Sequence, residues 1–393
     1  MSDKLDRLRL SLLVEPGDAR LPALLHAHPP GRIVAALRAD GQLDGTALPE
    51  SWRIRGSRSD GGNDEARAVL QAARRQAMRW VCPDDAEWPE CLGDLDLARP
   101  INHTRGAPLG LWVRGRLMLA DALERSVAVV GARDATTYGC EVAGDLAADL
   151  ADGGITVISG AAYGIDSCAH RGALALQGPT MAVLACGADV DYPRANAGLL
   201  ARIADQGLVI SEQPPGQTPT KGRFLTRNRL IAALARGTVV VEAARRSGAL
   251  NTLNWAAELG RVAMGVPGPV TSQASVGVHQ SLRSGQSILV TSGAEVIEAI
   301  EAIGSFDATL PSAPATDYDA LAPAMKAVLE AVPVGVAGSV ESIAATVPCE
   351  VADARTVLDA LVDRDWVRLV EGRWRLARRA DLSTGRLPRT VTG

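Results

Sequence analysis

The central part of the chain alternates short, continuous apolar runs with segments of helix length. Runs of this kind, apolar at successive positions, are typical of strands buried on both faces of a sheet. Helix-length segments such as Cys140–Asp152 and Asn251–Gly260 separate most of them. The expected strands are VAVV at 127–130, TVIS at 156–159, MAVLA at 181–185, LVIS at 208–211, TVVVE at 238–242, VAMGV at 262–266 and SILV at 287–290. Repeated βαβ units predict an α/β fold, an extended, Rossmann-like, doubly wound and mostly parallel sheet.

The residues before this pattern are expected to form two further parts. Residues 1–75 show short apolar helical patterns broken by Pro-Gly and Gly-Gly, which predicts a small helical N-terminal domain. Residues 76–125 are irregular, with one strand-like piece at Leu109–Val113, and are interpreted as a connector packed on the sheet. The core domain is therefore placed at 76–303.

The residues after the core change character twice. Residues 304–320 are rich in Pro, Ser, Thr and Ala without periodicity and predict a linker. Residues 321–378 follow the order helix, helix, helix and hairpin, with Glu371-Gly372 as the hairpin turn, which favours a C-terminal winged-helix domain. Residues 379–393 are expected to be a flexible tail.

Composition narrows the class of protein. Hydrophobic residues make up 47% and charged residues 22% of the 393 residues, as in ordinary globular proteins. The sequence shows no signal-peptide pattern and no apolar run of membrane-spanning length, so we expect a cytoplasmic protein without membrane contact. The six cysteines lack CxxC spacing and the five histidines are scattered, so no metal site, disulfide framework or cofactor is expected.

Charge is distributed unevenly along the chain. The net charge of −4 argues against a nucleic-acid-binding protein. Between Lys221 and Arg246, however, seven basic residues face a single acid, Glu242, which gives a local net charge of +6. A solvated surface is the ordinary explanation of such a run, and a binding site for an anionic polymer is the alternative.

Three expected strands run into turns of small and polar residues. Gly131 and Arg133 follow the first strand, Ser159 and Gly160 end the second, and the strand ending at Glu242 leads to Ser247, Gly248 and Thr252. Strand-to-helix turns of this kind present backbone N–H groups to anions at the carboxyl edge of a parallel sheet. Together the turns predict a phosphate-binding crevice, although each glycine alone can serve only to relieve a tight turn.

Asp166 and His170 lie four residues apart after the second of these turns. On a helix they would share one face, as an acid/base pair requires. No nucleophile or metal partner lies within the motif, so we interpret Asp166 as a helix cap and His170 as a structural hydrogen-bonding residue.

The segment KGRFLTRNR, Lys221 to Arg229, combines cations with an aromatic residue. Phe224 is one of two phenylalanines and Lys221 is one of three lysines in the chain. Aromatic side chains that stack on bases, beside cations that pair with phosphates, are how proteins hold single strands. Phe224 could instead anchor the following helix in the core.

These motifs, taken in order, resemble the DprA/Smf family of bacterial DNA-processing proteins. The resemblance spans about residues 105–300. Small helical N-terminal and winged-helix C-terminal domains also fit such proteins. The motifs that carry it are Gly131-Ala132-Arg133, Tyr138-Gly139, Ser159-Gly160, Gly164-Ile165-Asp166, Ala169-His170, Tyr192-Pro193, Ser211-Glu212, Phe224 with Arg227-Asn228-Arg229, Glu242-Ala243, Ser247-Gly248 and Pro267-Gly268.

The resemblance implies a role without catalysis. The protein would bind and protect incoming single-stranded DNA and load RecA onto it during natural transformation and recombination. It also implies that Arg133, Arg194, Lys221 and Phe224 contact DNA, with Arg227, Asn228 and Arg229 forming or supporting the pocket. A homodimer is implied through the last part of the core, with Ala257, His279, Leu282 and Ile288 at the interface.

The chain departs from the family pattern at four positions. Ala132 stands where serine is common, Leu225 where proline is common, and Ala249 and Asn251 replace the more usual serine and isoleucine. The loss of a serine at position 132 leaves the backbone N–H to contact phosphate alone.

The sequence disfavours two other classes of function. A nucleotide-processing phosphoribohydrolase of the lysine-decarboxylase-like fold is disfavoured, because the chain has Pro267-Gly268-Pro269 but no PGGxGT loop. A winged-helix DNA-binding regulator is disfavoured because the third C-terminal helix carries Arg355 and Arg364 among four aspartates, a poor surface for reading duplex DNA.

Overall fold

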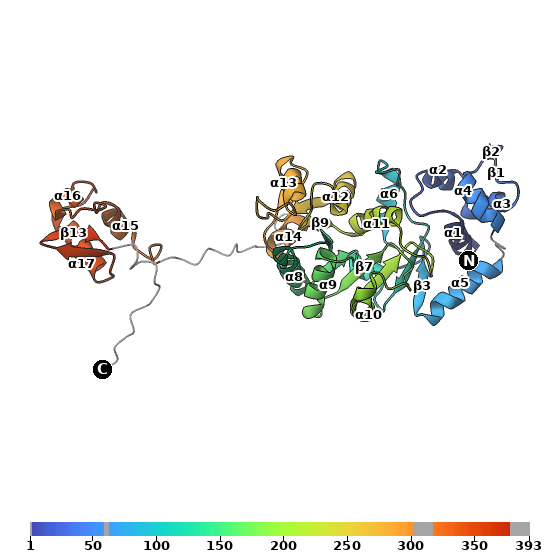
Figure 1. Ribbon diagram of the computed structural model, residues 1–393, viewed down its shortest axis with the longest axis horizontal. Helices are drawn as coiled ribbons and strands as arrows, with labels where there is room; N and C mark the ends of the chain where they lie inside the picture. Colours follow the sequence, from blue (N-terminus) through green and yellow to red (C-terminus); the bar gives the residue numbers. More distant parts are fainter. Residues whose placement is uncertain (1, 59–62, 302–316, 378–393) are drawn as a thin grey trace. The chain divides into compact units, whose positions relative to one another are not determined.

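The structure is a computed structural model that describes residues 2–58, 63–301 and 317–377 (Figure 1). By contacts the chain divides into two units, Met1–Ala308 and Thr309–Gly393. Most of the linker predicted at 304–320, and the whole tail predicted at 379–393, lie outside the described residues. The finer division of the first unit near residues 75 and 125 stays a prediction.

A nine-stranded sheet forms the centre of the first unit, in the order β11-β10-β9-β5-β6-β7-β8-β4-β3. From β11 to β8 all neighbours are parallel, whereas β4 pairs antiparallel with both β8 and β3. The predicted large, mostly parallel α/β sheet is therefore confirmed. The strands are β3 (Met78–Val81), β4 (Leu111–Arg114), β5 (Ser126–Val130), β6 (Thr156–Ser159), β7 (Thr180–Leu184), β8 (Leu208–Ser211), β9 (Gly237–Val240), β10 (Val262–Gly265) and β11 (Ile288–Leu289).

The two ends of the sheet differ most from the prediction. Strand β3 was not expected, because its sequence MRWV alternates weakly; it pairs with β4 and packs Trp80 against Trp112, with ring centroids 5.0 Å apart. At the opposite edge, the run SILV yields only the two strand residues of β11. Both Ile288 and Leu289 are about half exposed, because β11 is an edge strand that has a neighbouring strand, β10, on one side only.

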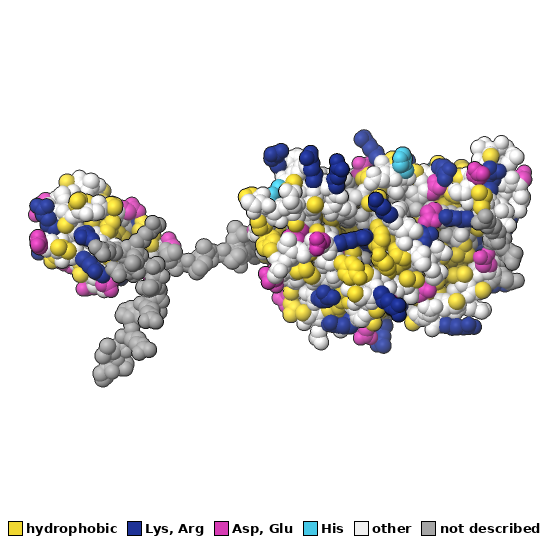
Figure 2. Space-filling view, viewed as in Figure 1, with side chains coloured by type: hydrophobic (Ala, Val, Ile, Leu, Met, Phe, Trp, Pro, Cys, Tyr) yellow, Lys and Arg dark blue, Asp and Glu magenta, His cyan; other side chains and the backbone are white. Residues whose placement is uncertain are grey.

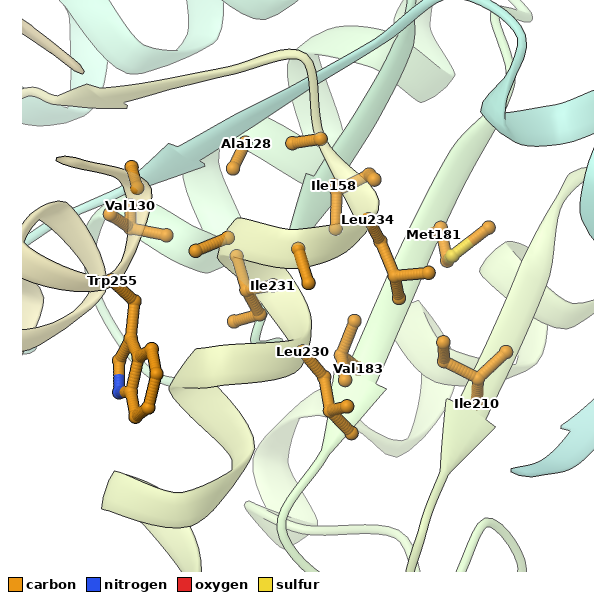
Figure 3. Packing of buried hydrophobic residues seen from close by; sticks show 14 of the residues in the cluster. Ala128, Val130, Ile158, Met181, Val183, Ile210, Leu230, Ile231, Leu234 and Trp255 are labelled. Carbon is orange, nitrogen blue, oxygen red and sulfur yellow. The ribbon is translucent and has the colours of Figure 1, made fainter. Parts of the chain in front are cut away.

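Helices cover both faces of the sheet, because alternate strand residues point to opposite sides. Ala128 and Val130 of β5 join a hydrophobic cluster with α11 (Lys221–Leu234) and α12 (Gly248–Glu258), part of which Figure 3 shows. Val127 and Val129 join a cluster on the other face. That face carries α8 (Thr137–Asp152), α9 (Ile165–Ala175), α10 (Ala197–Gln206) and α14 (Gly293–Ile300).

The N-terminal helices pack directly on the sheet. Leu8 of α1 (Ser2–Leu13) and Ala66 and Ala73 of α5 (Asn63–Arg75) share a cluster with Trp80 and Trp112. A second cluster holds the rest of this segment together. The remaining elements of the first unit are α2 (Leu21–Ala27), α3 (Pro30–Arg38), β1 (Gln42–Leu43), β2 (Thr46–Ala47), α4 (Glu50–Arg58), η1 (Glu90–Gly93), α6 (Asp94–Leu97), α7 (Leu119–Leu123), η2 (Arg194–Asn196) and α13 (Val276–Arg283).

The strand order reverses at the middle of the sheet. Strands β5 to β8 are added in one direction, and the chain then returns so that β9 pairs with the other side of β5. The chain therefore leaves the carboxyl ends of β5 and β9 in opposite directions. Such a reversal opens a crevice at the carboxyl edge, which is where doubly wound proteins bind ligands.

Residues 317–377 of the second unit form three helices and one antiparallel hairpin around their own core. Leu329, Ile343, Leu358 and Trp374 lie in that core. The predicted turn at Glu371-Gly372 is present, since both residues have positive φ and join a two-residue hairpin. The elements are α15 (Pro323–Glu330), α16 (Val340–Ala344), α17 (Val351–Val362), β12 (Val367–Val370) and β13 (Arg373–Leu376).

Two glycines in the contact between α8 and α9 predict opposite effects on stability. A Cβ added at Gly172 would lie 2.1 Å from the carbonyl oxygen of Gly144, whereas a Cβ at Gly144 would meet nothing nearer than 4.0 Å. Gly172→Ala should therefore force the helices apart and lower the free energy of unfolding by about 1–3 kcal/mol. Gly144→Ala should raise it by about 0.5–1 kcal/mol, because alanine favours the helix.

Urea denaturation of the full chain, followed by hydrogen exchange in α8 and α9, measures both changes. Equal effects of the two substitutions would show that the helices do not approach at Gly172.

Candidate nucleic-acid interface

A cavity of about 1000 Å³ opens at the carboxyl edge, where the strand order reverses. The turn after β5, the start of α11, the start of α12 and one side of α13 form its walls. Nine of the residues predicted to bind nucleic acid line it: Gly131, Arg133, Lys221, Phe224, Arg227, Asn228, Ser247, Gly248 and Thr252. Of the predicted set, Ser159, Gly160, Arg194 and Arg229 do not.

The segment KGRFLTRNR forms the first nine residues of α11. The side chain of Thr220 caps this helix by accepting a hydrogen bond from the Arg223 N–H, 3.3 Å away. Lys221, Phe224 and Asn228 follow helical spacing and so face the cavity together. Exposure falls along the segment, from the exposed Lys221 to a half-buried Phe224 and a buried Asn228.

Three flat side chains gather at one end of the cavity. The Arg133 guanidinium carbon lies 4.2 Å from the centre of the Phe224 ring, and the Tyr192 ring lies 5.8 Å from it. Arg133 and Lys221 are both exposed beside this group. We call these four residues, Arg133, Tyr192, Lys221 and Phe224, the aromatic end. It offers planar surfaces for bases and two cations for phosphates.

Arg227 forms the floor beside the aromatic end. Its side chain is buried and donates a hydrogen bond to the carbonyl of Val183, 2.7 Å away. Gly160 packs flat on its guanidinium, since a Cβ there would lie 1.7 Å from Nη1. Burial lowers the pKa of Arg227, and the charge of Asp166 acts in the opposite direction. Gly160 thus contributes by leaving room for Arg227.

Asp166 and His170 do not form an acid/base pair. Burial raises the pKa of Asp166, although Arg227 and the backbone N–H of Ala162 oppose the shift. His170 Nδ1 lies 2.7 Å from the hydroxyl of Thr180, which itself donates to the carbonyl of Val157. His170 is completely buried and does not line the cavity. Its contacts are those of a structural residue.

Ser159 and Arg229 have structural contacts of their own. Ser159 is fully buried and donates its hydroxyl hydrogen bond to the carbonyl of Val129, 2.6 Å away. Arg229 is fully buried and forms a 2.8 Å ion pair with Glu212. Burial raises the pKa of Glu212, and the charge of Arg229 opposes that shift. The exposed Arg194 begins η2 and does not line the cavity.

The basic block between Lys221 and Arg246 is not one surface. Arg227 and Arg229 point inward, and Arg223 donates to Glu15 at 2.7 Å. Burial alone would raise the pKa of Glu15, but hydrogen bonds and charge from Arg223 and Arg55 lower it below its ordinary value. The local charge of the sequence therefore overstates the number of cations available to a ligand.

Glu242 holds the turn that carries Arg133. Its buried carboxylate accepts hydrogen bonds from the Thr136 hydroxyl at 2.6 Å and from the Thr136 N–H at 2.9 Å. Its carbonyl accepts from the N–H of Ala132 at 2.7 Å. The end of β9 is thereby tied to the turn after β5, which fixes Arg133 near α11.

Several lining residues escaped the sequence-based prediction. Tyr192 is 40% exposed; the Tyr192-Pro193 motif of the family resemblance was the usable signal for it, but no DNA contact was predicted there. Arg245, Arg246 and Asn251 lie in the turn and helix start that follow Glu242, but no DNA contact was predicted for them. The polar residues Asn254, Gln280 and Gln286 carry no motif, and only the fold brings them to the cavity.

The residues expected at a dimer interface lie on three elements. Ala257 is exposed on α12, and Ile288 is 50% exposed on the edge strand β11. Leu282 of α13 packs partly into the chain's own core. His279 Nε2 lies 3.1 Å from the carbonyl oxygen of Gly268. The interface stays a prediction.

The described residues, 2–58, 63–301 and 317–377, have neither the arrangement of a metal site nor that of a membrane-spanning helix. Within these ranges no cluster of His, Cys, Asp or Glu is arranged to hold a metal ion. No helix in the same ranges has the length and apolar character needed to cross a membrane.

Comparison with known proteins agrees with the motifs. The family model of DNA recombination-mediator protein A matches residues 79–301. A DprA protein of Mycobacterium tuberculosis is 42% identical over 94% of this chain and 93% of its own length, and Protein Smf of Escherichia coli is 36% identical over 58% of each. The X-ray structure of DNA processing protein A from Streptococcus pneumoniae covers 76% of this chain and 98% of its own, with a TM-score of 0.62 and 30% identity.

The chain belongs to the DprA/Smf family of DNA-processing proteins. The family description is that of a recombination mediator and not of an enzyme, in agreement with the role that the resemblance implied.

His170 predicts a specific dependence of stability on pH. Burial, followed by the charge of Arg227, lowers its pKa from 6.5 to about 3. Between these values the unfolded chain binds a proton at His170 that the folded chain does not, so the free energy of unfolding falls as pH drops below about 6.5. The slope attributable to this one group approaches about 1.4 kcal/mol per pH unit.

Urea denaturation of the wild type and of His170→Gln, between about pH 5 and about pH 7, tests this dependence. The variant should lose stability less steeply as the pH falls. Parallel slopes for the two proteins would show that His170 is not held neutral in the folded state.

Proposed function

We propose that the cavity at the carboxyl edge is a binding site for single-stranded DNA. The observation that carries the proposal is the aromatic end, where Phe224, Tyr192 and Arg133 present flat groups beside the cation of Lys221. Unstacked bases have free faces for such groups, whereas the bases of a duplex are stacked on one another. Membership of a DNA-processing family supports the same ligand.

Each predicted contact residue has a proposed role that follows from its position. Lys221 pairs with phosphate, Arg133 reaches a base or a phosphate, and Phe224 stacks on a base. Ser247, Gly248 and Thr252 at the start of α12 offer N–H and hydroxyl donors to a phosphate. Arg227 and Asn228 shape the floor, while Ser159, Gly160 and Arg229 support it from behind. Arg194, two residues after Tyr192 in the chain, pairs with a phosphate of the same strand.

The wider role is proposed at the level of the family. The protein would be cytoplasmic, protect incoming single-stranded DNA and load RecA onto it during natural transformation and recombination. Two copies would associate through Ala257, His279, Leu282 and Ile288. The order of helices and the hairpin in the second unit support a winged helix, for which we propose a role in protein contact.

Fluorescence anisotropy with labelled single-stranded and duplex oligonucleotides tests the ligand. The single strand should bind more tightly, with a logarithmic salt slope of about −0.7 for each phosphate neutralised. Lys221→Glu and Arg133→Glu should abolish binding, because each places a negative charge at the aromatic end. Deletion of residues 317–393 should leave binding unchanged. Equal affinity for single strand and duplex would contradict the site.

Two substitutions of Phe224 distinguish a role in stacking on a base from a role in the hydrophobic core. Phe224→Ala should weaken single-strand binding by about 1–3 kcal/mol, the range for loss of one base–aromatic stack. Phe224→Leu retains apolar volume without a flat face and should lose affinity while keeping the thermal unfolding temperature. A variant that unfolds at lower temperature but binds normally would make Phe224 a core residue.

A further inference from the structure

The cavity continues well beyond the aromatic end. It passes the start of α12 and ends beneath the last turn of α13 at Ser284 and Gln286. A hydrogen bond of 2.6 Å from Gln286 to Asn254 joins α12 to the segment after α13 and closes this far part. Amides and hydroxyls line it, and in the described chain the lining of the whole cavity has no acid other than Asp166.

A smaller hollow of about 360 Å³ lies on the other side of α13. Val276, His279, Gln280 and Arg283 line it, and their spacing places them on one face of the helix. Arg245 and Gln280 line both this hollow and the main cavity. The two depressions therefore meet at α13.

Three exposed arginines border this meeting point: Arg245, Arg246 and Arg283. Within the described residues none of the three forms an ion pair. Figure 2 shows Lys and Arg side chains in a row along the upper rim of the unit, above α13 and α12. Cations without acidic partners beside a groove attract an anionic chain.

We propose that the strand bound at the aromatic end continues along this rim. Arg245, Arg246 and Arg283 then bind the phosphates of the further nucleotides. We call these three residues the arginine rim. The ligand class is a single-stranded phosphodiester backbone, and the contact is independent of base, because within the described residues no Phe, Tyr or Trp lines the α13 hollow and the ring of His279 is held by the carbonyl of Gly268. The inference rests on the proposed single-strand site and extends it to a second set of nucleotides.

The same helix carries two of the proposed dimer contacts, His279 and Leu282. Arg283 lies exposed at the end of α13, and Arg245 and Arg246 lie exposed in the turn before α12. Exposed cations next to a cavity lined by polar groups suit phosphate and would repel the same arginines of a second copy, so the strand occupies the rim and the proposed dimer contact is confined to the other residues of α13.

Oligothymidylates of two lengths test the proposal with the full-length protein. A strand of about 6 nucleotides fills the aromatic end, and one of about 20 also reaches the arginine rim. The variant is Arg245→Ala/Arg283→Ala. Its matched control is Arg171→Ala/Arg202→Ala, which removes two exposed arginines from α9 and α10, helices that pack on the opposite face of the sheet.

The rim variant should bind the short strand like the wild type and the long strand several-fold more weakly. Its logarithmic salt slope for the long strand should be shallower by about 1.4, or about 0.7 for each lost phosphate contact. The control should match the wild type with both strands, and Lys221→Glu should abolish binding of both.

Three results would overturn the arginine rim. One is an unchanged long-strand affinity in the rim variant, and another is an equal loss with both strands. The third is a loss accompanied by a change of oligomeric state in analytical ultracentrifugation, which would make the hollow an interface between copies. If instead Lys221→Glu binds both strands normally, the aromatic end itself fails, and that result is separate from these three.

Discussion

The site depends on one buried cation. Arg227 leaves α11, crosses over Gly160 at the end of β6 and donates to Val183 of β7. A single guanidinium thus ties the helix to the ends of two neighbouring strands. Burying a charge is costly unless it is compensated, and here Asp166 and a carbonyl provide the compensation. This anchor fixes α11 over the carboxyl ends of β6 and β7.

The other parts of the site are fixed in comparable ways. Glu242 ties the Arg133 turn to β9, and the ion pair between Arg229 and Glu212 fixes α11 from its buried side. The exposed groups, Arg133, Lys221 and Phe224, stand on this rigid base. A protein that binds a long polymer through a few flat and cationic side chains binds it more tightly when those side chains are already held in the bound geometry. Most polar residues of the motifs therefore lie beneath the surface that would meet DNA.

The sequence predicted the sheet because buried parallel strands leave continuous apolar runs, such as those at 127–130 and 208–211. It did not predict β3, whose pairing with β4 depends on two tryptophans from distant positions. The three glycine-containing turns were placed correctly at one edge, since the carboxyl ends of parallel strands meet there. The basic block was harder to interpret, because charge along the chain does not reveal that Arg227 and Arg229 face inward. The cavity beneath α13 has no linear signature, since its amides come from helices that only folding brings together.

The contact between Glu15 and Arg223 connects the N-terminal segment to α11, the helix that carries Lys221 and Phe224. Arg223 lies in the first turn of α11, between Lys221 and Phe224, and its partner follows α1. The helix that carries the aromatic end is therefore braced by a piece of chain more than 200 residues away. A protein or ligand that shifted α1 would change the pose of Lys221 and Phe224 without touching either. Through this ion pair, the N-terminal segment can influence the proposed DNA-binding helix α11 without contacting the nucleic acid itself.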